Sequence, residues 1–454
     1  MSSPQSLCHS HRLLRALAIW LSVAIGLLAA TAPLQAAAPW GETYVLPNGL
    51  RVILSPDRRF PSVTVFMRYH VGARHEPAGR SGIAHLVEHL TFRMPRPSVK
   101  AGTYSSFFTV SSANGTTDYD HTDYYTTVPS GDIKYALWKE RWRMGINLSH
   151  VEDSVRRQEL DVVRNERRQR IEIAPYSSGR HRLWSELFPK GHPYHDEVIG
   201  SMEDLAQITI DEVKQYMTTH YGPHNATLAV VGDFDPNHAR AYIEEYFAPM
   251  PARAKPAAPT DKVAALEQAV ILEHIEPYGK NRRVHMAWHT PPLYAPDNAA
   301  GEVLARLIGG MEASRIMTRV PDAVFHTAFQ ENMLGGSVFH IVVEPKPSSD
   351  VESVQRQVDL VVNFLRAKAP TDEEVDQAVR RIVLDRMRSM QDTLSKAALM
   401  VDVIVDGRAP ADPLAFEIAR FRAVTGEDVR RFAETYLRNN QRVVVTSIPL
   451  VDSR

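Results

Sequence analysis

One short segment of the chain, His85-Leu86-Val87-Glu88-His89, holds two histidines and a glutamate at a spacing suited to metal chemistry. The flanking residues are compatible with a helix, in which positions four apart lie on the same face. The imidazoles of His85 and His89 would therefore lie side by side, at a spacing suited to one tetrahedral zinc ion. Glu88 lies one turn from His85, so its carboxylate reaches the same region without having to be a ligand. A carboxylate beside a zinc-bound water is the arrangement used for metal-assisted peptide hydrolysis.

A third metal ligand is available in a later segment, Asp153 to Arg170, whose pattern predicts a helix. Glu159 and Glu166 are seven residues apart in it and therefore share one face, two turns apart. Many neighbouring residues are arginines, so a solvated helix face is the alternative for either glutamate alone. The upstream H-x-x-E-H segment makes this alternative the weaker one. Three protein ligands would leave the zinc ion a fourth position for water, which is typical of catalytic rather than structural sites.

These motifs resemble the zinc site of the pitrilysin–insulinase metallopeptidases, which carry H-x-x-E-H in place of H-E-x-x-H. Glu166 follows His89 by 77 positions (166 − 89). The resemblance is strong over roughly residues 43 to 240 and weak over the remainder. The other matching segments keep the family's order: Asn114-Gly115-Thr116-Thr117 with Asp120, Thr122 and Tyr124-Tyr125, then Asn165 to Arg170, His192-Pro193-Tyr194, and Asn225 to Leu228 with Gly232-Asp233-Phe234.

The resemblance implies a role for each matched position of the metal site. His85, His89 and Glu166 would bind one zinc ion per chain. Glu88 would be the general base that activates the zinc-bound water. Glu159 would orient the site from behind the ligands, as metal sites generally require.

The resemblance also implies how a substrate would bind. The run from Ser111 to Thr117 is similar to the family's substrate strand, and Ser112, Ala113 and Asn114 would contact the peptide. We expect this strand to pair with an extended peptide through backbone hydrogen bonds. The implied enzyme is a zinc-dependent endopeptidase that hydrolyses extended peptides or small unfolded proteins.

One segment of the second half departs from the family. In active members, a segment after a Ser-Arg-Leu-like motif carries an Arg and a Tyr that hold the substrate carbonyl near zinc. Ser314-Arg315-Ile316-Met317 fits that motif, but residues 321–329 supply neither donor at the expected places. His326 could substitute, although a structural histidine is the more common role. Without such a donor, catalysis would lose on the order of 10²-fold or more.

Two classes of function follow from this departure. The first is a zinc endopeptidase of the bacterial periplasm, similar to the catalytic subunit of the mitochondrial processing peptidase. The second is a non-catalytic or partner-dependent subunit of a heterodimeric peptidase or assembly complex. A related subunit that lacks the zinc ligands but carries the donors would complete the site, with a homodimer or a monomer using His326 as alternatives. A zinc hydrolase acting on something other than peptides is a distant third interpretation.

The composition is that of a globular protein without a nucleic-acid partner. The chain has 454 residues, of which 44% are hydrophobic and 23% charged, and this length suffices for two or more domains. Its 52 basic residues against 53 acidic ones give a net charge of −1, so no electrostatic footprint for nucleic acid is present.

The first 37 residues have the pattern of a secretory signal. A basic start precedes an apolar run from Ala16 to Ala30, and small residues follow, which predicts cleavage around Ala36 to Ala38. An uncleaved membrane anchor is the alternative, but the apolar run is short for spanning a bilayer. The single cysteine, Cys8, lies inside this segment. We therefore expect a periplasmic or secreted protein without disulfides and without stable membrane insertion.

The body of the chain alternates between predicted strands and helices. In the strand Ser62 to Tyr69, the odd-numbered residues from Val63 to Tyr69 would line one face. Ser111 to Pro129 has the composition of strands, broken at Asn114-Gly115. The other predicted elements are a strand over Leu50 to Leu54 and helices near 131–147, 152–171 and 180–187.

The chain reads as a diverged repeat of two α+β domains. A Pro- and Ala-rich linker at 250–269 separates a zinc-binding domain at 41–249 from a domain without metal at 270–454. The segment that closes the first half, from Thr209 to Val231, returns at the end of the chain at a constant offset of 216. A strand at Val284 to His289 and a helix at Asn298 to Ile308 open the second half. The resemblance implies that the two domains face each other across a cleft.

Overall fold

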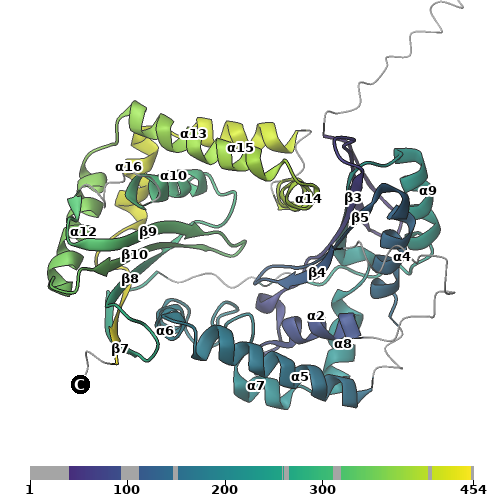
Figure 1. The fold of residues 1–454 in the computed structure, drawn as a ribbon, viewed down its shortest axis with the longest axis horizontal. Helices are drawn as coiled ribbons and strands as arrows, with labels where there is room; N and C mark the ends of the chain where they lie inside the picture. Colours follow the sequence, from purple (N-terminus) through teal and green to yellow (C-terminus); the bar gives the residue numbers. More distant parts are fainter. Residues whose placement is uncertain are drawn as a thin grey trace, which may run out of the picture. The chain divides into compact units, whose positions relative to one another are not determined.

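Two β-sheets, each with its own set of helices, organise the chain (Figure 1). The computed structural model describes residues 40–93, 112–146, 152–257, 259, 265–309, 319–406 and 412–450. The signal-peptide prediction, Cys8 and the motif at 314–317 lie outside these residues. Within the described part, no helix combines the length and the apolarity that crossing a membrane requires.

Among the described residues, the first sheet has six strands in the order β1-β2-β6-β3-β5-β4. β2 and β6 are parallel, and the other neighbouring strands are antiparallel. β4 is therefore the outermost strand at one end. The strands are β1 (Glu42–Val45), β2 (Arg51–Pro56), β3 (Ser62–Tyr69), β4 (Ser112–Thr117), β5 (Thr122–Pro129) and β6 (Ala226–Gly232).

Helices pack on this sheet around one hydrophobic core. The odd-numbered residues of β3 from Val63 to Tyr69 belong to that core, as the alternation predicts. The longer helices of this half are α2 (Ile83–Arg93), α4 (Ile133–Met144), α5 (Asp153–Arg167), α6 (Ser177–Leu187), α7 (Met202–Gln207), α8 (Ile210–His220) and α9 (Pro236–Phe247).

The second sheet, as far as the structure describes it, has five strands in the order β7-β11-β8-β10-β9, with β7 and β11 parallel. Its strands are β7 (Val270–Glu276), β8 (Arg283–Thr290), β9 (Ala323–Glu331), β10 (Ser337–Pro345) and β11 (Val443–Pro449). The described α-helices of this half are α10 (Asn298–Gly309), α12 (Val351–Ala367), α13 (Asp372–Ser389), α14 (Thr393–Val401), α15 (Pro413–Arg422) and α16 (Gly426–Tyr436).

The two sheets share one topology, which confirms the expected fold class of two related α+β domains. The order β2-β6-β3-β5-β4 corresponds to β7-β11-β8-β10-β9, and among the described strands of these two orders only the first pair of each, β2-β6 and β7-β11, is parallel. α8 and α16 begin 216 residues apart (426 − 210), each after a capping box that starts at Thr209 or Thr425. Residues 251–257, within the predicted linker, have no helix or strand.

Each half also contributes one helix to the other half. α6 packs on β11 and β8 of the second sheet, and α14 packs on β6 and β3 of the first. On the first sheet, the buried Arg68 donates to both oxygens of Asp123, at 2.8 and 2.7 Å, and to Asp402 in the π-helical turn after α14. The face of β3 opposite the odd-numbered core residues is therefore joined to the second half by an ion pair of the buried Arg68.

The predicted break at Asn114-Gly115 is wrong. β4 runs unbroken through both residues, and Gly115 pairs with Tyr124 of β5. The strands turn instead at 118–121, where the backbone N–H of Asp118 donates to the carbonyl of His121 at 2.8 Å. Glycine at position 115 lets the Glu88 carboxylate approach the backbone of β4, because a Cβ there would lie 3.0 Å from that carboxylate.

Candidate metal centre

The helix that carries the H-x-x-E-H segment, α2, is held at its start by the half-buried carboxylate of Glu76. Glu76 accepts the backbone N–H groups of Gly82, at 3.0 Å, and Ala84, at 2.9 Å, which the first helical turn leaves without partners. Gly82 has φ +88°, and a Cβ there would lie 2.7 Å from the carbonyl oxygen of Ile199. Any side chain at position 82 would clash with the segment at Ile199, so glycine is needed where the chain enters α2.

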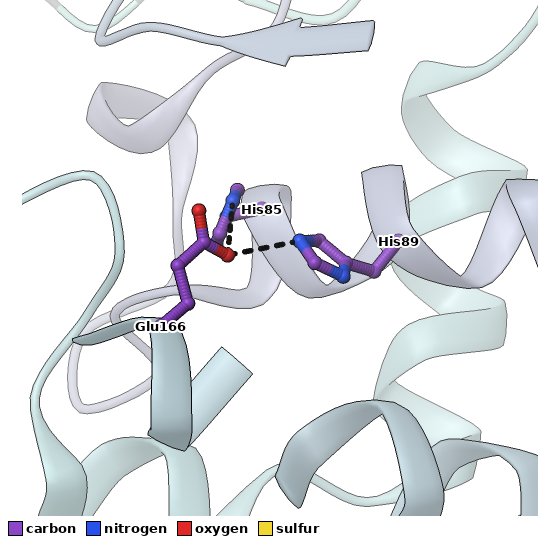
Figure 2. A group of neighbouring side chains, drawn as sticks. All are labelled: His85, His89 and Glu166. Atoms are coloured by element: carbon purple, nitrogen blue, oxygen red, sulfur yellow. Dashed lines mark ion pairs between the residues drawn. The ribbon is translucent and has the colours of Figure 1, made fainter. Parts of the chain in front are cut away.

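The three predicted ligands meet between two helices. Figure 2 shows His85 and His89 of α2 with Glu166 of α5. The Oε2 atom of Glu166 lies 3.7 Å from Nε2 of His85 and 3.2 Å from Nε2 of His89. One ligand atom from each residue lies within 4.8 Å of the others, and no second group of this kind occurs among the described residues.

The trio has the donor set and the spacing of a zinc site. Bonds of about 2.0–2.1 Å at tetrahedral angles place neighbouring ligand atoms about 3.3 Å apart. The two distances to Glu166 lie close to that separation. Burial, together with the charges of His89 and Arg170, lowers the pKa of His85 to about 3. Its imidazole is therefore neutral at pH 7, as metal ligation requires.

Two of the three candidate ligands, His89 and Glu166, are also contacted by charged side chains outside the trio. The Oε2 atom of Glu159 lies 3.4 Å from Nδ1 of His89, and its Oε1 accepts Nε–H of Arg93 at 2.6 Å. Nη2 of Arg170 lies 3.0 Å from Oε1 of Glu166. Arg170 belongs to a π-helical turn, Arg168–Glu172, that continues α5, and such turns are frequent at functional sites.

Glu88 points into the same region but is not one of the trio. Its Oε2 accepts a hydrogen bond from the hydroxyl of Thr117 at 2.7 Å. Burial raises the pKa of Glu88, while the Thr117 hydrogen bond and the charge of His89 act in the opposite direction. A buried carboxylate with a raised pKa suits proton transfer near neutral pH.

A cavity of about 520 Å³ connects the trio to the edge strand. The four residues Asn114 to Thr117 of β4 line it together with Arg170, Ile171 and the segment 197–199. Ser112 and Ala113 are exposed on the same strand but do not line the cavity. His326, the considered substitute donor, lies in β9 opposite Val343, and it does not line this cavity either.

Three neighbours of the site were not predicted from the sequence. Arg93 follows His89 by four residues, and Arg170 follows Glu166 by four, so helical spacing was the available signal for both. Thr117 carries no such signal, because its contact with Glu88 depends on how β4 packs on α2.

The repeated α+β domains, with three candidate metal ligands in one of them, resemble the architecture expected of a metallopeptidase. The family model "Insulinase (Peptidase family M16)" matches residues 51–173, and "Peptidase M16 inactive domain" matches residues 207–382. The chain belongs to this insulinase, or M16, peptidase family.

Proteins with similar sequences are named as proteases or peptidases. The chain is 27% identical over 442 residues to "Zinc protease PqqE" of Helicobacter pylori, covering 93% of this chain and 96% of that protein. It is 26% identical over 219 residues to "Mitochondrial-processing peptidase subunit beta" of Saccharomyces cerevisiae, covering 48% and 46%. These relatives support a peptidase function and suggest zinc as the metal.

Solved structures share the fold of both halves. A protease from Helicobacter pylori superposes with a TM-score of 0.80 at 24% identity, covering 90% of this chain and 99% of that one. The periplasmic protease PqqL from Escherichia coli superposes with a TM-score of 0.73 at 17% identity, covering 90% of this chain and 47% of that one. At these identities the likeness concerns the fold alone.

Proposed function

We propose that the protein is a zinc-dependent endopeptidase that hydrolyses extended peptides or small unfolded proteins. His85, His89 and Glu166 would hold one zinc ion per chain, with Glu88 as the general base. The observation that carries the proposal is the meeting of the two Nε2 atoms with Oε2 of Glu166, at 3.7 and 3.2 Å, beside a second carboxylate, that of Glu88. A zinc ion in this trio would act as a Lewis acid and make a bound water more acidic.

The side chains around the trio would transfer the proton and orient the metal ligands. Glu88 takes the proton of the attacking water on its carboxylate and passes it to the leaving amine. Glu159 holds the ring of His89 at Nδ1, which keeps Nε2 of the same ring directed at Glu166 and the proposed zinc position. Arg170 holds Oε1 of Glu166, which leaves Oε2 directed at the two histidines.

The edge strand β4 would bind the substrate. Its outer edge has no strand beside it in the described sheet, and Asn114 lines the cavity of the trio. A peptide that adds to this edge as a further strand is bound through its backbone. Ser112, Ala113 and Asn114 would then contact an extended segment, with limited dependence on its side chains.

Zinc content and two variants test the proposal. The chain without its predicted signal segment should bind about one zinc ion. His89→Ala should abolish binding, and Glu88→Gln should retain zinc while losing peptide cleavage. Unchanged peptidase activity in Glu88→Gln removes the general-base assignment, and normal zinc content in His89→Ala removes the trio.

A partner subunit is the second part of the proposal. The segment 321–329 supplies neither the Arg nor the Tyr expected to polarise the substrate carbonyl, and His326 does not line the cavity. We infer that a related chain without zinc ligands supplies these donors in a heterodimer, with a homodimer as the alternative. Residues 207–382 match the family model of the M16 inactive domain, which supports the proposal that the second half binds no metal.

Purification from the native host tests the partner and the location together. We expect the protein in the periplasm or outside the cell, with a second chain of similar size across a large, stable interface. A single chain that cleaves peptides alone, at about 1 s⁻¹ or faster, needs no partner. In that case the heterodimer is wrong and the endopeptidase stands.

A further inference from the structure

The carboxylate of Glu88 is held by the strand that would bind the peptide, and not only by its own helix. The hydroxyl of Thr117, at the end of β4, donates to Oε2 of Glu88 at 2.7 Å. This distance lies within the short range typical of hydroxyl donation to a carboxylate. Thr117 and Glu88 are 29 residues apart in the chain. The contact therefore depends on the packing of β4 against α2.

The alternation of β4 directs Thr117 toward the helix. Gly115 is buried and Thr117 half-buried, whereas Asn114 and Thr116 are exposed. Residues two apart share one face of a strand. A Cβ at Gly115 would lie 3.0 Å from Oε1 of Glu88, so this face closely borders both oxygens of the carboxylate.

The end of β4 is itself held in place. Thr117 pairs with Thr122 of β5, and the hydroxyl of Thr122 donates to the carbonyl of Val71 at 2.8 Å. The next residue, Asp118, donates its backbone N–H to His121 at 2.8 Å and closes the turn. A donor on such a braced hairpin has little freedom, which is what a positioned catalytic group needs from its neighbours.

We propose that Thr117 is a positioning residue for the general base. Its hydroxyl holds one oxygen of Glu88, which leaves the other to take the proton of the attacking water. Because β4 would also pair with the peptide, this one strand would position both the general base and the substrate. The inference rests on the proposed function, since it concerns the base of that reaction.

Two substitutions at Thr117 separate the hydroxyl from the shape of the side chain. Thr117→Val keeps the shape and removes the donor, and Thr117→Ser restores the donor. We expect Thr117→Val to lower kcat by about 10- to 100-fold, because small displacements of a catalytic group cost this much, with KM unchanged. Thr117→Ser should keep kcat within about threefold of the unchanged protein.

Thr127→Val is the matched control. Thr127 belongs to the same hairpin, opposite Ser112, but its hydroxyl contacts Thr64 at 2.8 Å and not the site. Its kcat should equal that of the unchanged protein. The probe is a fluorescence-quenched peptide chosen by cleavage from a random library, and it is used with whichever preparation cleaves, the chain alone or the chain with its co-purified partner. Zinc content and melting temperature are measured for every variant.

The outcomes distinguish this inference from the proposed function. A kcat of Thr117→Val within twofold of the unchanged protein, while Glu88→Gln is inactive, contradicts the role of Thr117 alone. A loss that serine does not restore, that Thr127→Val reproduces, or that accompanies zinc loss also contradicts it. Full activity in Glu88→Gln, or no cleavage by any preparation, removes the proposed function and this inference with it.

Discussion

The carboxylate behind His89 offers a quantitative test of how the metal centre is built. Glu159 is 4% exposed, and its Oε2 lies 3.4 Å from Nδ1 of His89. Replacing it by Gln removes the charge and keeps the shape. Replacing it by Leu removes both the charge and the hydrogen-bonding group.

The geometry sets the expected size of the effect. Loss of a carboxylate that supports a ligating histidine typically costs 10- to 100-fold in metal affinity. The 3.4 Å distance is longer than a normal hydrogen bond. In addition, Arg93 at 2.6 Å offsets part of the charge of Glu159. We therefore expect about a 10-fold weaker zinc affinity for Glu159→Gln, or about 1.4 kcal/mol, and a larger loss for Glu159→Leu.

Competition with a chromophoric chelator at fixed pH measures these affinities. Asp161→Asn is the control, because Asp161 lies on the same helix with a side chain that is 72% exposed. Its zinc affinity should equal that of the unchanged protein. A dissociation constant for Glu159→Leu within twofold of the unchanged protein would refute a role for Glu159 in orienting the site.

Three further predictions concern the contacts between the halves and the substrate strand. Arg68→Met removes the arginine that donates to both oxygens of the buried Asp123 carboxylate and should cost about 3–5 kcal/mol in urea unfolding; a cost below about 1 kcal/mol contradicts this. Burial raises the pKa of Asp406 from 3.8 to about 6, with the charge of Arg68 acting in the opposite direction. This raised pKa favours the folded state below pH 3.8, and that advantage is lost as the pH rises through about 6. Asp406→Asn should abolish the fall in unfolding free energy between pH 3.8 and about 6, and it should be more stable than the unchanged protein at pH 7.5 by about 1–3 kcal/mol. An unchanged dependence of the unfolding free energy on pH contradicts the raised pKa of Asp406. In a proline scan of a cleaved peptide, cleavage should fail where proline removes an N–H that faces β4; uniform tolerance beside the scissile bond contradicts strand addition.

Much of the fold follows from local patterns. Alternation predicts which face of β3 enters the core, and the offset of 216 predicts that the segments holding α8 and α16 are repeats of one another. Helical spacing alone places His85 beside His89. The third residue of the trio, Glu166, needed the resemblance to a known family, because spacing cannot tell which helices pack together. The three side chains meet in the structure, while their role as zinc ligands stays a prediction.

The contacts that escaped prediction join elements far apart in the chain. Arg68 and Asp402 are 334 residues apart, and nothing near either residue indicates their pairing. The turn at 118–121 was misplaced because Asn-Gly is a frequent turn sequence, whereas Gly115 here gives Glu88 room beside β4. In both cases tertiary packing decides what the local sequence leaves open.

The most direct test of the metal centre is the position of zinc itself. Crystals of the chain without its predicted signal segment, grown with zinc, would give an anomalous difference map at the zinc absorption edge. The proposal predicts one strong peak within about 2.0–2.2 Å of Nε2 of His85, Nε2 of His89 and a carboxylate oxygen of Glu166. A zinc-saturated protein whose strong peak lies among other side chains, or that shows no peak at this trio, would contradict it.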